Sequence, residues 1–477
     1  MNRNSEESHS LTDAKLEDGA MMNCVVMKFG GTSVGDVSRI RHVGEIVKEY
    51  RLQNPGTGVV VVLSAMAGET NRLVALAKSC VSSPALRELD VLLASGEQVT
   101  ISLLAMRLIE MGIQSQSFLA PQVRIVTDGA HTNAHIAAID TEDVRALLDR
   151  GGVPVIAGFQ GVNEDGDITT LGRGGSDITA VAVAAALKAK TCFIYTDVRG
   201  VFSTDPRVCS HAKLLGEVSH EEMLEMASLG AKVLHTRSVY FAMRYHVPLV
   251  VLSTFDGPLR PHHNGTWIVS RQRGDDGLLT HGSSHKGEYS RPEGLPSTKS
   301  GGIGRESAER RDSQKGDESM EEPVVTGITH RVDEAKVVID GMPHTPSATA
   351  TLFEVLSAKG VFIDMISQEA LSEDRQTVSI TVPDEHSDLA LTTIRDAMER
   401  LGAMGVRIER DIAKVSVVGI GMRYHTGVAS RMFSALAREQ ISIQMVNTSE
   451  IKISVLVPRK FWETAVRALH KEFIEAN

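Results

Sequence analysis

Short apolar segments rich in β-branched residues recur through the first half of the chain, with helical patterns between them. The apolar segments lie at 25–29, 58–65, 153–161, 191–198 and 247–253. The segments 90–112 and 176–190 have the length and spacing of helices. Strands that are apolar throughout are buried on both faces, and their alternation with helices is typical of a parallel sheet. Residues 23–270 are therefore predicted to form an α/β domain, a mainly parallel sheet sandwiched by helices.

Two segments depart from this pattern. Residues 1–22 are polar and acidic and lack the apolar centre of a signal peptide, so we expect a disordered extension there. Residues 271–322 are rich in glycine, serine and charges of both signs. They have too little apolar content to offset the entropy of ordering, so we interpret them as a flexible linker or insertion.

The last third of the chain contains an internal repeat. The segment 353–367 returns in altered form at 433–447. Each copy has the order strand, helix, strand, strand, helix, strand, which predicts two ferredoxin-like βαββαβ domains within 323–477. We place these domains at about 332–408 and 409–477.

Composition and charge narrow the range of partners. The chain has 477 residues, of which 42% are hydrophobic and 23% are charged, and its net charge is -10. Such an acidic protein is a poor match for nucleic acid or an anionic membrane surface, and no apolar run reaches the length of a membrane-spanning helix. The four cysteines form no CxxC pair and show no metal-like pairing with histidine. We expect reduced thiols in a cytoplasmic protein.

A lysine and two glycines end the first predicted strand. In the sequence VVMKFGGTSVGD, Lys28 is followed by Gly30 and Gly31. Glycines let backbone N–H groups approach an anion, and lysine supplies a positive charge suited to phosphate. The order differs from that of a Walker A loop, in which glycines precede the lysine. The motif therefore predicts a phosphate site, and a tight turn beside a solvated lysine is the alternative.

Two further segments carry charged or hydroxyl side chains where strands meet helices. In TTLGRGGSDITAV, Arg173 offers a planar group for a carboxylate, and Ser176 and Asp177 begin the next predicted helix. In IYTDVRGVFSTDPR, residues 196–207 follow a strand, and Lys232 lies further on in GAKVLHTRS. Ligands of open α/β sheets bind at the carboxyl ends of the strands, so we expect one shared site. A capped helix with a solvated arginine and an exposed turn are the alternatives.

The chain resembles the aspartate kinases of the amino-acid-kinase family in the motifs KFGGTSV, VLSAM, ASGE, GFQGVNEDGDITTLGRGGSD, YTDVRGVFSTDPR and NTSEIKISVL. The resemblance covers about 24–270 and 323–477. It implies ATP-dependent phosphorylation of the side-chain carboxylate of L-aspartate to 4-phospho-L-aspartate, the first step of lysine, threonine and methionine biosynthesis. It also implies a requirement for ATP and Mg²⁺, with the metal held mainly by ATP and not by protein ligands.

The resemblance also assigns roles to matching positions. The implied catalytic residues are Lys28, Glu97, Arg173 and Asp177. Glu97 would hold the ammonium group of aspartate, Arg173 would hold its α-carboxylate, and Asp177 would position Lys28 and the substrate. The other implied substrate contacts are Thr70 and Ser176. The residues implied to bind ATP are Lys28, Phe29, Gly30, Gly31, Ser64, Thr196, Asp197, Phe202, Ser203, Thr204, Asp205, Pro206, Arg207 and Lys232.

The residue types agree with this chemistry. A carboxylate with a pKa of about 4 is ionised at pH 7 and needs no general base. Catalysis then depends on positioning and on neutralising phosphate charge, for which lysine, backbone N–H groups and Mg²⁺ are suited. We therefore interpret the histidines, including His131, His135, His262 and His263, as structural or exposed.

The repeated units resemble ACT domains, which bind small amino acids at the interfaces they form when paired. The resemblance implies feedback by lysine, threonine or both, through a shift in the conformational equilibrium of the catalytic domain. It also implies that the strand within 323–331 completes the second unit, so that the two units are interwoven. The implied effector positions are Ile363, Asp364 and Gln368 in the first unit, and Val428, Ser442, Ile443, Ser449 and Glu450 in the second.

Two loops depart from the ACT pattern. Residues 344–347 read HTPS where the family often carries an aspartate and then Pro-Gly, and residues 425–427 read HTG where a His-Pro-Gly loop is expected. A lost glycine restricts the backbone, and a lost carboxylate removes a partner for an ammonium group. The second unit is therefore the better candidate for a working effector site. The alternative is that both units only hold an oligomer together.

Assembly and the reading of function leave alternatives open. We expect a homo-oligomer or an α/β hetero-oligomer through the ACT domains, and Met320 is a candidate internal start for a short regulatory chain. A sister kinase acting on glutamate, N-acetylglutamate, carbamate or a nucleotide is one alternative, although a kinase of acylated amines would not need Glu97. A catalytically dead amino-acid sensor is the other alternative, and the intact set Lys28, Glu97, Arg173 and Asp177 argues against it.

Overall fold

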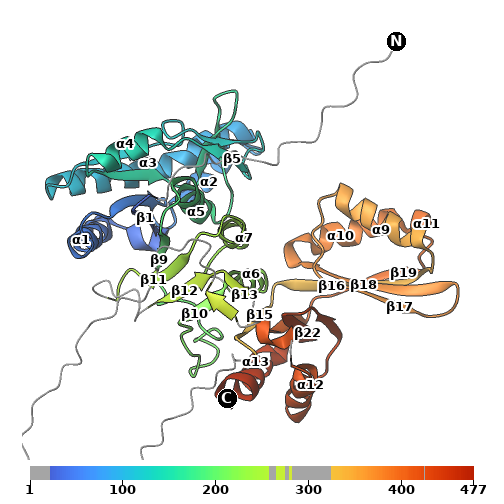
Figure 1. Ribbon diagram of the computed structural model, residues 1–477. Helices are drawn as coiled ribbons and strands as arrows, with labels where there is room; N and C mark the ends of the chain where they lie inside the picture. Colours follow the sequence, from blue (N-terminus) through green and yellow to red (C-terminus); the bar gives the residue numbers. More distant parts are fainter. Residues whose placement is uncertain are drawn as a thin grey trace, which may run out of the picture.

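The computed structural model describes residues 22–231, 233–256, 265–273, 279–281, 324–423 and 425–476. Most of the predicted extension and linker lies outside these ranges, as do Met320, Lys232, His262 and His263. Figure 1 shows an N-terminal α/β domain beside two smaller units formed by the C-terminal part of the chain. The predicted linker begins with two short paired strands, β13 (Arg271–Arg273) and β14 (Leu279–His281).

An eight-stranded sheet forms the centre of the N-terminal domain, in the order β10-β12-β11-β9-β1-β2-β6-β3. Its strands are β1 (Cys24–Phe29), β2 (Gly58–Leu63), β3 (Ser115–Phe118), β6 (Val153–Ala157), β9 (Thr191–Thr196), β10 (Glu217–Ser219), β11 (Leu249–Ser253) and β12 (Thr266–Val269). Neighbouring strands are parallel apart from the antiparallel pair β11 and β12. The prediction of a mainly parallel sheet is confirmed.

Helices cover both faces of this sheet. They are α1 (Val37–Gln53), α2 (Glu69–Cys80), α3 (Leu86–Glu110), α4 (Glu142–Asp149), α5 (Gly175–Leu187), α6 (His220–Ser228) and α7 (Thr236–Arg244). Successive side chains of a strand point to opposite faces. In β1, Val25 and Met27 join the core on the side of α1 and α3, whereas Cys24 and Val26 join the core on the side of α4 to α7. Burial of each such valine contributes roughly 1.5–3 kcal/mol.

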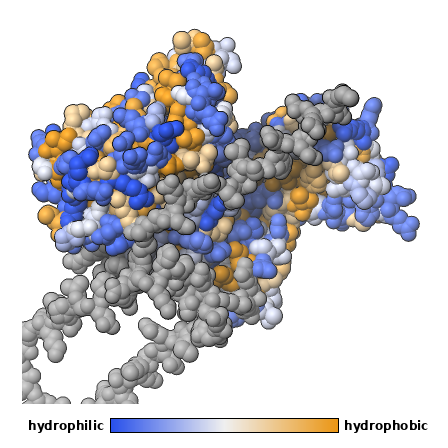
Figure 2. Space-filling model, turned by 45° about the horizontal axis from the view of Figure 1, so that its top comes forward, coloured by the Kyte–Doolittle hydropathy of each residue, from blue (hydrophilic) through white to orange (hydrophobic). Residues whose placement is uncertain are grey.

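The helix α3 covers one face of the large sheet, with its other side exposed. By length and composition alone it could cross a membrane, but half of its apolar window is buried. Its residues Ile101, Leu104 and Leu108 lie in the core beside α1 and the sheet. The molecular face drawn in Figure 2 mixes hydrophilic with hydrophobic residues.

A small second sheet lies beside the large one, in the order β5-β4-β7-β8. Its strands are β4 (Ile125–Thr127), β5 (Ile136–Ile139), β7 (Gln160–Val162) and β8 (Ile168–Thr170). The sequence predicted one strand over 153–161, and this prediction is wrong. The strand β6 ends at Ala157, and the chain turns at Gly158 and Phe159, where Phe159 has a φ of 70°. The following residues therefore enter the small sheet.

The first C-terminal unit has the predicted order of elements. They are β16 (Glu334–Pro343), α9 (Pro346–Ala358), β17 (Ile366–Ala370), β18 (Arg375–Pro383), α10 (Asp384–Asp396), α11 (Met398–Leu401) and β19 (Gly405–Glu409). The strands form a four-stranded antiparallel sheet in the order β17-β18-β16-β19, and the helices lie on one face of it (Figure 1). Leu352, Leu356 and Ile394 fill the core between helices and sheet.

The second C-terminal unit takes one strand from an earlier part of the chain. Its own elements are β20 (Ile412–Val418), α12 (Val428–Arg438), β21 (Met445–Thr448), β22 (Lys452–Pro458) and α13 (Trp462–His470). The fourth strand of its sheet is β15 (Gly327–Arg331), which precedes the first unit and pairs with β20. Ile328 of β15 packs in one core with Val415 and Leu469. The chain therefore contributes to the second unit both before and after it forms the first.

The second unit is in direct contact with the N-terminal domain. Glu222 on α6 accepts hydrogen bonds from Thr326 Oγ1 at 2.5 Å and from the Ile420 N–H at 3.0 Å. Lys452 of β22 forms an ion pair with Glu225 at 2.9 Å. These contacts join α6 to one end of the second unit's sheet, where β15 begins, β20 ends and β22 begins.

Candidate active site

The carboxyl ends of β1, β2 and β9 meet at one edge of the large sheet because these strands are parallel. Gly30 and Gly31 follow β1, Ser64 follows β2, and Thr196 ends β9. The helix α5 begins beside this edge, where Ser176 Oγ lies 2.7 Å from Ser64 Oγ. Segments that are far apart in the sequence are thus brought together where the sequence predicted one site.

Lys28 carries a positive charge at the end of a buried strand. It shares a face of β1 with Cys24 and Val26, and that face packs against α5. Its Nζ atom lies 2.5 Å from Asp177 Oδ1, and the two residues are only 7% and 9% exposed. A buried charge needs a partner. Asp177 therefore holds the ammonium group of Lys28 at the start of α5.

Two glycines let α5 approach this edge closely. Gly174 precedes the helix with a φ of 71°, and a Cβ atom there would lie 2.3 Å from the Cβ of His235. A Cβ atom on Gly158 would lie 2.7 Å from the Cβ of Ser176. A side chain at either position would therefore push the helix away. Among the described residues no side chain caps α5. The Gly175 N–H bonds to the Gly172 carbonyl, and the next N–H groups and the positive end of the helix dipole are left for an anion.

Glu97 is a buried carboxylate with one unpaired oxygen. It lies on α3 and is 2% exposed. Its Oε1 accepts a hydrogen bond from the Ala65 N–H at 3.0 Å, whereas Oε2 has no hydrogen-bond partner within the described part of the chain. Burial raises the pKa of Glu97 to about 7. An unpaired buried oxygen costs free energy, and an ammonium group of a ligand would remove that cost.

Arg173 and Thr70 are more accessible than Glu97. Arg173 lies in the turn before α5, is exposed, and forms no hydrogen bond or ion pair with any other described residue. Its planar group is therefore free to bind a carboxylate. Thr70 lies in the first turn of α2 and is partly exposed.

Ser203 contacts the second C-terminal unit instead of the sheet edge. It is fully buried, and its Oγ atom lies 3.0 Å from His470 Nε2 at the end of α13. Its backbone carbonyl accepts a hydrogen bond from the Ile328 N–H of β15 at 2.7 Å. The turn at 202–207, which was predicted to bind ATP, therefore also touches the C-terminal part of the chain.

The rest of this turn is divided between buried and exposed residues. Phe202 bridges to Leu214, and Thr204 is buried. Asp205 and Arg207 form an ion pair at 2.8 Å. The side chain of Arg207 is 83% exposed, so this pair leaves it accessible from solvent.

Three other predicted ATP contacts differ in how directly they can reach a ligand. Phe29 is fully buried and its ring stacks on Tyr195 at 4.5 Å between centroids, so only its backbone can face a ligand. Asp197 is exposed and accepts a hydrogen bond from Thr196 Oγ1 at 3.2 Å. Pro206 is exposed in the turn.

Two residues near the site were not predicted from the sequence. The ring of His235 lies against Gly174, and burial lowers its pKa. Asp90 on α3 is fully buried and accepts a hydrogen bond from Thr170 Oγ1 at 2.5 Å, and His131 Nδ1 lies 2.8 Å from its Oδ2. An acidic residue inside the apolar pattern of 90–112 was the one available indication of Asp90.

The implied effector positions are distributed between surface and core. Asp364 forms an ion pair with the buried Lys414, and Gln368 donates a hydrogen bond to Thr349 Oγ1 at 3.3 Å. Val428 is 6% exposed and begins α12. All members of the set other than Val428 are exposed or half-buried, including Ile363, Ser442, Ile443, Ser449 and Glu450.

The two loops that depart from the ACT pattern both begin helices. In the first, Thr345 accepts a hydrogen bond from the Ala348 N–H and Pro346 opens α9. This is a favourable helix start that needs no glycine. In the second, Gly427 precedes α12 with a φ of 97°, a conformation that favours glycine.

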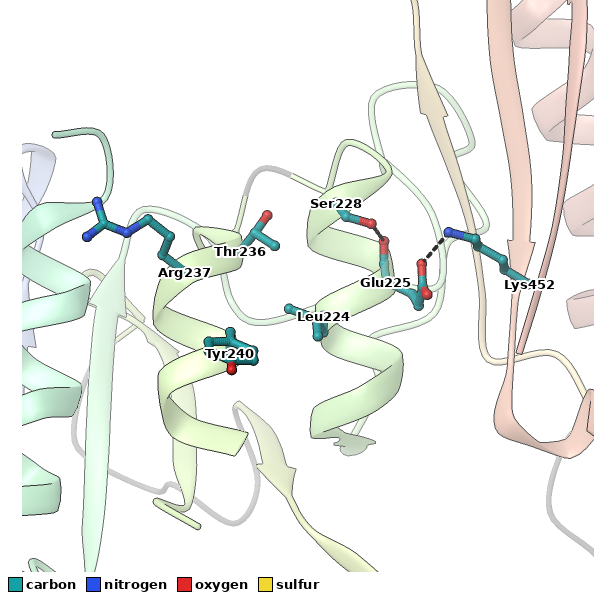
Figure 3. A pocket seen from close by; sticks show the side chains of 7 residues that line it. All are labelled: Leu224, Glu225, Ser228, Thr236, Arg237, Tyr240 and Lys452. Carbon is teal, nitrogen blue, oxygen red and sulfur yellow. Dashed lines mark hydrogen bonds and ion pairs between the residues drawn. The ribbon is translucent and has the colours of Figure 1, made fainter. Parts of the chain in front are cut away.

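A cavity of about 460 Å³ lies between α6, α7 and β22 (Figure 3). Its lining residues are Leu224, Glu225, Ser228, Thr236, Arg237, Tyr240 and Lys452. The ion pair between Lys452 and Glu225 lies at one side of the cavity (Figure 3). The cavity belongs to the contact between the two parts of the chain, and it contains none of the predicted site residues.

Comparison with known proteins gives the same architecture. A model of the amino acid kinase family matches residues 23–253, and a model of the ACT domain matches residues 336–398 and 415–473. An aspartokinase of Pseudomonas aeruginosa is 48% identical over 453 residues, which cover 95% of this chain and 98% of that protein. An aspartokinase of Thermus thermophilus is 39% identical over 454 residues, which cover 95% and 99%.

Solved structures resemble the whole chain. Aspartokinase III of E. coli in complex with aspartate and ADP, in its R-state, matches with a TM-score of 0.70 at 25% identity, covering 94% of this chain and 99% of that one. The same enzyme in complex with lysine and aspartate, in its T-state, matches with a TM-score of 0.66 at 26% identity, covering 95% and 100%.

Proposed function

The chain belongs to the aspartate kinase branch of the amino acid kinase family, and we propose that its sheet edge transfers the γ-phosphoryl group of ATP to the side-chain carboxylate of L-aspartate. The observation that carries the proposal is the pairing of Lys28 with Asp177 beside the open start of α5, close to the unpaired oxygen of Glu97. The product is 4-phospho-L-aspartate, which enters lysine, threonine and methionine biosynthesis.

Each charged residue has a distinct task in this proposal. Glu97 binds the ammonium group of aspartate through its unpaired oxygen, and the exposed Arg173 binds the α-carboxylate. The two contacts fix the amino acid, so that its side-chain carboxylate points toward Lys28. Because that carboxylate is already ionised, no residue is needed to remove a proton.

Lys28 and α5 act on the phosphate groups. Lys28 neutralises charge on the transferred phosphoryl group, and Asp177 holds the ammonium group in place. The N–H groups in the first turn of α5 beyond Gly175 and the Gly31 N–H add hydrogen-bond donors, whereas the Gly30 N–H bonds to the Tyr195 carbonyl. Mg²⁺ supplies further charge neutralisation when bound, and we expect the ATP phosphates to hold it. Lys232 and the turn at 202–207 remain proposed nucleotide contacts.

The ACT units are proposed to make this activity responsive to amino acids. Lysine, threonine or both are the expected effectors, and the second unit is the better candidate site because Gly427 keeps its loop unrestricted. We also propose a cytoplasmic location, an oligomer formed through the ACT units, and a short regulatory chain that begins at Met320. Replacing Met320 by Leu should remove that short product, and an unchanged short band on a gel would contradict its origin there.

The first test is the formation of aspartyl phosphate, trapped as its hydroxamate, in the presence of ATP and Mg²⁺. Lys28→Ala should reduce kcat by at least about 10²–10³-fold, because it removes a donor aimed at developing charge. The matched control is Lys48→Ala on the exposed surface of α1, which should keep full activity. Product from glutamate or another acid, and none from aspartate, would assign the chain to a sister kinase.

A further inference from the structure

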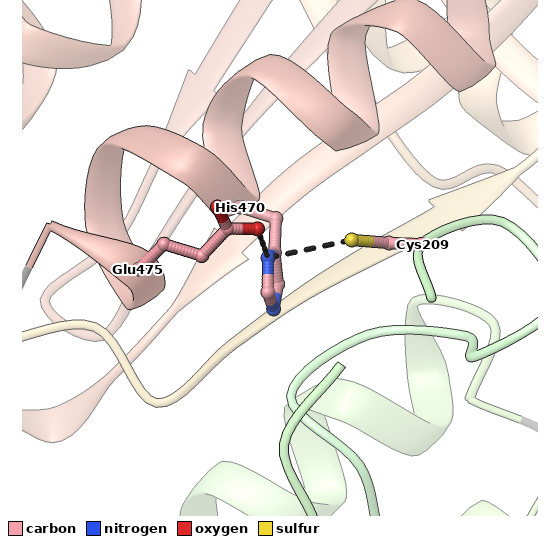
Figure 4. A group of neighbouring side chains, drawn as sticks. All are labelled: Cys209, His470 and Glu475. Atoms are coloured by element: carbon pink, nitrogen blue, oxygen red, sulfur yellow. Dashed lines mark hydrogen bonds and ion pairs between the residues drawn. The ribbon is translucent and has the colours of Figure 1, made fainter. Parts of the chain in front are cut away.

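Three metal-ligating side chains meet where the N-terminal domain contacts the end of the chain. Cys209 follows the turn at 202–207, His470 ends α13, and Glu475 closes the short helix Lys471–Glu475 (Figure 4). The spacing of cysteines and histidines in the sequence shows no metal-like pairing, but the structure brings His470 beside Cys209. Its partner His470 is 261 residues away, so the sequence could not indicate their contact.

The distances within this cluster suit a tetrahedral metal ion. His470 Nδ1 lies 3.5 Å from Cys209 Sγ and 3.0 Å from Glu475 Oε1. All three ligand atoms lie within 4.8 Å of one another. Around a tetrahedral Zn²⁺ ion with its usual bond lengths, neighbouring S, N and O ligand atoms are about 3.4–3.6 Å apart. The two contacts of His470 Nδ1 are already close to this spacing, and the third pair, Cys209 and Glu475, would draw together as the ion binds.

The surroundings of His470 favour ligation by Nδ1. The imidazole is fully buried, and its Nδ1 faces both the thiol and the carboxylate, although one proton there could satisfy only one of them. On the other side of the ring, Ser203 Oγ lies 3.0 Å from Nε2 and is placed to accept its proton. Such a hydrogen bond fixes the tautomer that leaves Nδ1 free to bind a metal.

A fourth ligand is at hand. His211, two residues after Cys209, has its Nδ1 atom 3.4 Å from Glu475 Oε1, and its exposed side chain can turn toward the cluster. We propose that Cys209, His470 and Glu475, with His211, form a Zn²⁺ site that joins the turn at 202–207 to the C-terminal end of the second ACT unit. A set of one thiolate, two imidazoles and one carboxylate suits Zn²⁺, and four ligands make a structural site.

Binding of Zn²⁺ would release one proton, from the Cys209 thiol, and would reinforce the contact between the two parts of the chain. Cys209 loses its thiol proton to solvent as the metal–sulfur bond forms, and both imidazoles bind in the neutral form. The bound ion would stabilise the contact between Ser203 and His470, because it fixes the same ring from its other side. The nucleotide side of the N-terminal domain would thereby be tied to the regulatory unit.

The test uses the full chain and Co²⁺ as a spectroscopic substitute for Zn²⁺. The protein, freed of metal with a chelator, should bind one Co²⁺ per chain with a thiolate-to-cobalt charge-transfer band, and added Zn²⁺ should remove that band. Cys209→Ser, which is nearly isosteric, should abolish the band. Glu475→Gln should weaken binding by more than the about 10–100-fold that loss of an outer partner costs.

The matched control is Cys80→Ser, because Cys80 is exposed on α2, in a different part of the N-terminal domain. This variant should keep the band and the affinity of the wild type. A wild-type protein without the band, or a Cys209→Ser protein that retains it, would overturn the proposal. Neither measurement uses kinase activity, so an absent metal site would not affect the proposed function.

Discussion

Glu97 is proposed to hold the ammonium group of aspartate, and this role would couple aspartate binding to pH. Its carboxyl group is buried, and burial raises its pKa to about 7. Because the folded pKa is raised, the protonated form of Glu97 favours the folded state. This stability is fully present below the unfolded pKa of about 4.3 and is lost as the pH rises through the folded value. An ammonium group beside Oε2 favours the ionised form, so binding of aspartate is expected to release a proton when the pH is below about 7.

The affinity for aspartate should therefore depend on pH. We expect KM for aspartate to be constant above the pKa of Glu97 and to rise about tenfold for each unit by which the pH lies below it, because only the ionised carboxyl group pairs with the substrate. Steady-state kinetics on both sides of pH 7, with saturating ATP, would measure this change. A KM that is constant across this interval would contradict the role of Glu97.

Variants of acidic residues on α3 separate this effect from general changes with pH. Glu97→Gln should raise KM for aspartate and remove its pH dependence, since the amide does not titrate. Glu88→Gln is the matched control, because Glu88 lies on the same helix with a side chain that is 67% exposed. Its kinetics should follow those of the wild type at every pH.

The strands and helices near the site could largely be read from the sequence. The apolar run at 25–29 became β1, and the helical pattern at 176–190 became α5 (Gly175–Leu187). Lys28 and Asp177 lie at the ends of these elements, so their charges interrupt an otherwise apolar pattern, which made them visible. Burial on both faces explains why the run was continuous and not alternating.

Other features required knowledge of contacts between distant residues. The strands of the small sheet have three or four residues, too few for a periodic pattern. The turn at Phe159 was not visible, because only its φ of 70° shows that the strand ends. The role of Ser203 could not be predicted, since its partner His470 is 267 residues away.

A buried lysine joins the two ACT units. Lys414 of β20 lies 2.8 Å from Glu334 of β16, and their side chains are each 1% exposed. It also forms an ion pair with Asp364, in the segment before β17. Lys414 lowers the pKa of Asp364 even though burial raises it. Asp364, which the resemblance assigned to the effector, is thus already engaged with a cation.

Removing this lysine should destabilise the regulatory part of the chain. Lys414→Met leaves the buried carboxylate of Glu334, and the more exposed Asp364, without this partner, and breaking a buried ion pair costs about 3–5 kcal/mol of the free energy of unfolding. Urea denaturation followed by far-ultraviolet circular dichroism would measure the loss. Lys359→Met, at an exposed position after α9, should change the free energy by less than about 0.5 kcal/mol. Equal stabilities of the two variants would refute the argument.

Glu222 holds the kinase domain and the regulatory part together. It is 1% exposed, and its carboxylate accepts hydrogen bonds from Thr326, Ile420 and Ser219. Burial raises the pKa of Glu222, but the hydrogen bonds to its carboxylate lower it by more, so the net shift is downward. The resulting stability is present above the unfolded pKa of about 4.3 and is lost as the pH falls through the lower folded value.

The thermal stability of Glu222→Gln should reveal this contribution. The variant should have a lower Tm than the wild type at pH 7, where the amide replaces a charged acceptor, and the cost should be about 1–3 kcal/mol. The difference in Tm should shrink as the pH is lowered below the unfolded pKa, because the wild type then loses the same charge. The exposed Glu439→Gln variant should match the wild type throughout. A difference that grows in acid would have the wrong sign.

The path of the chain through the ACT units limits where a gene for this protein could be divided. The strand β15 ends at Arg331, before the first unit begins, and it pairs with β20 more than a full unit later. A polypeptide that started after Arg331 would leave β20 as a bare edge, open to pairing with foreign strands. One that started at Met320 would carry every strand of both sheets. A functional split, whether made by translation or by a protein engineer, therefore has to fall upstream of Gly327.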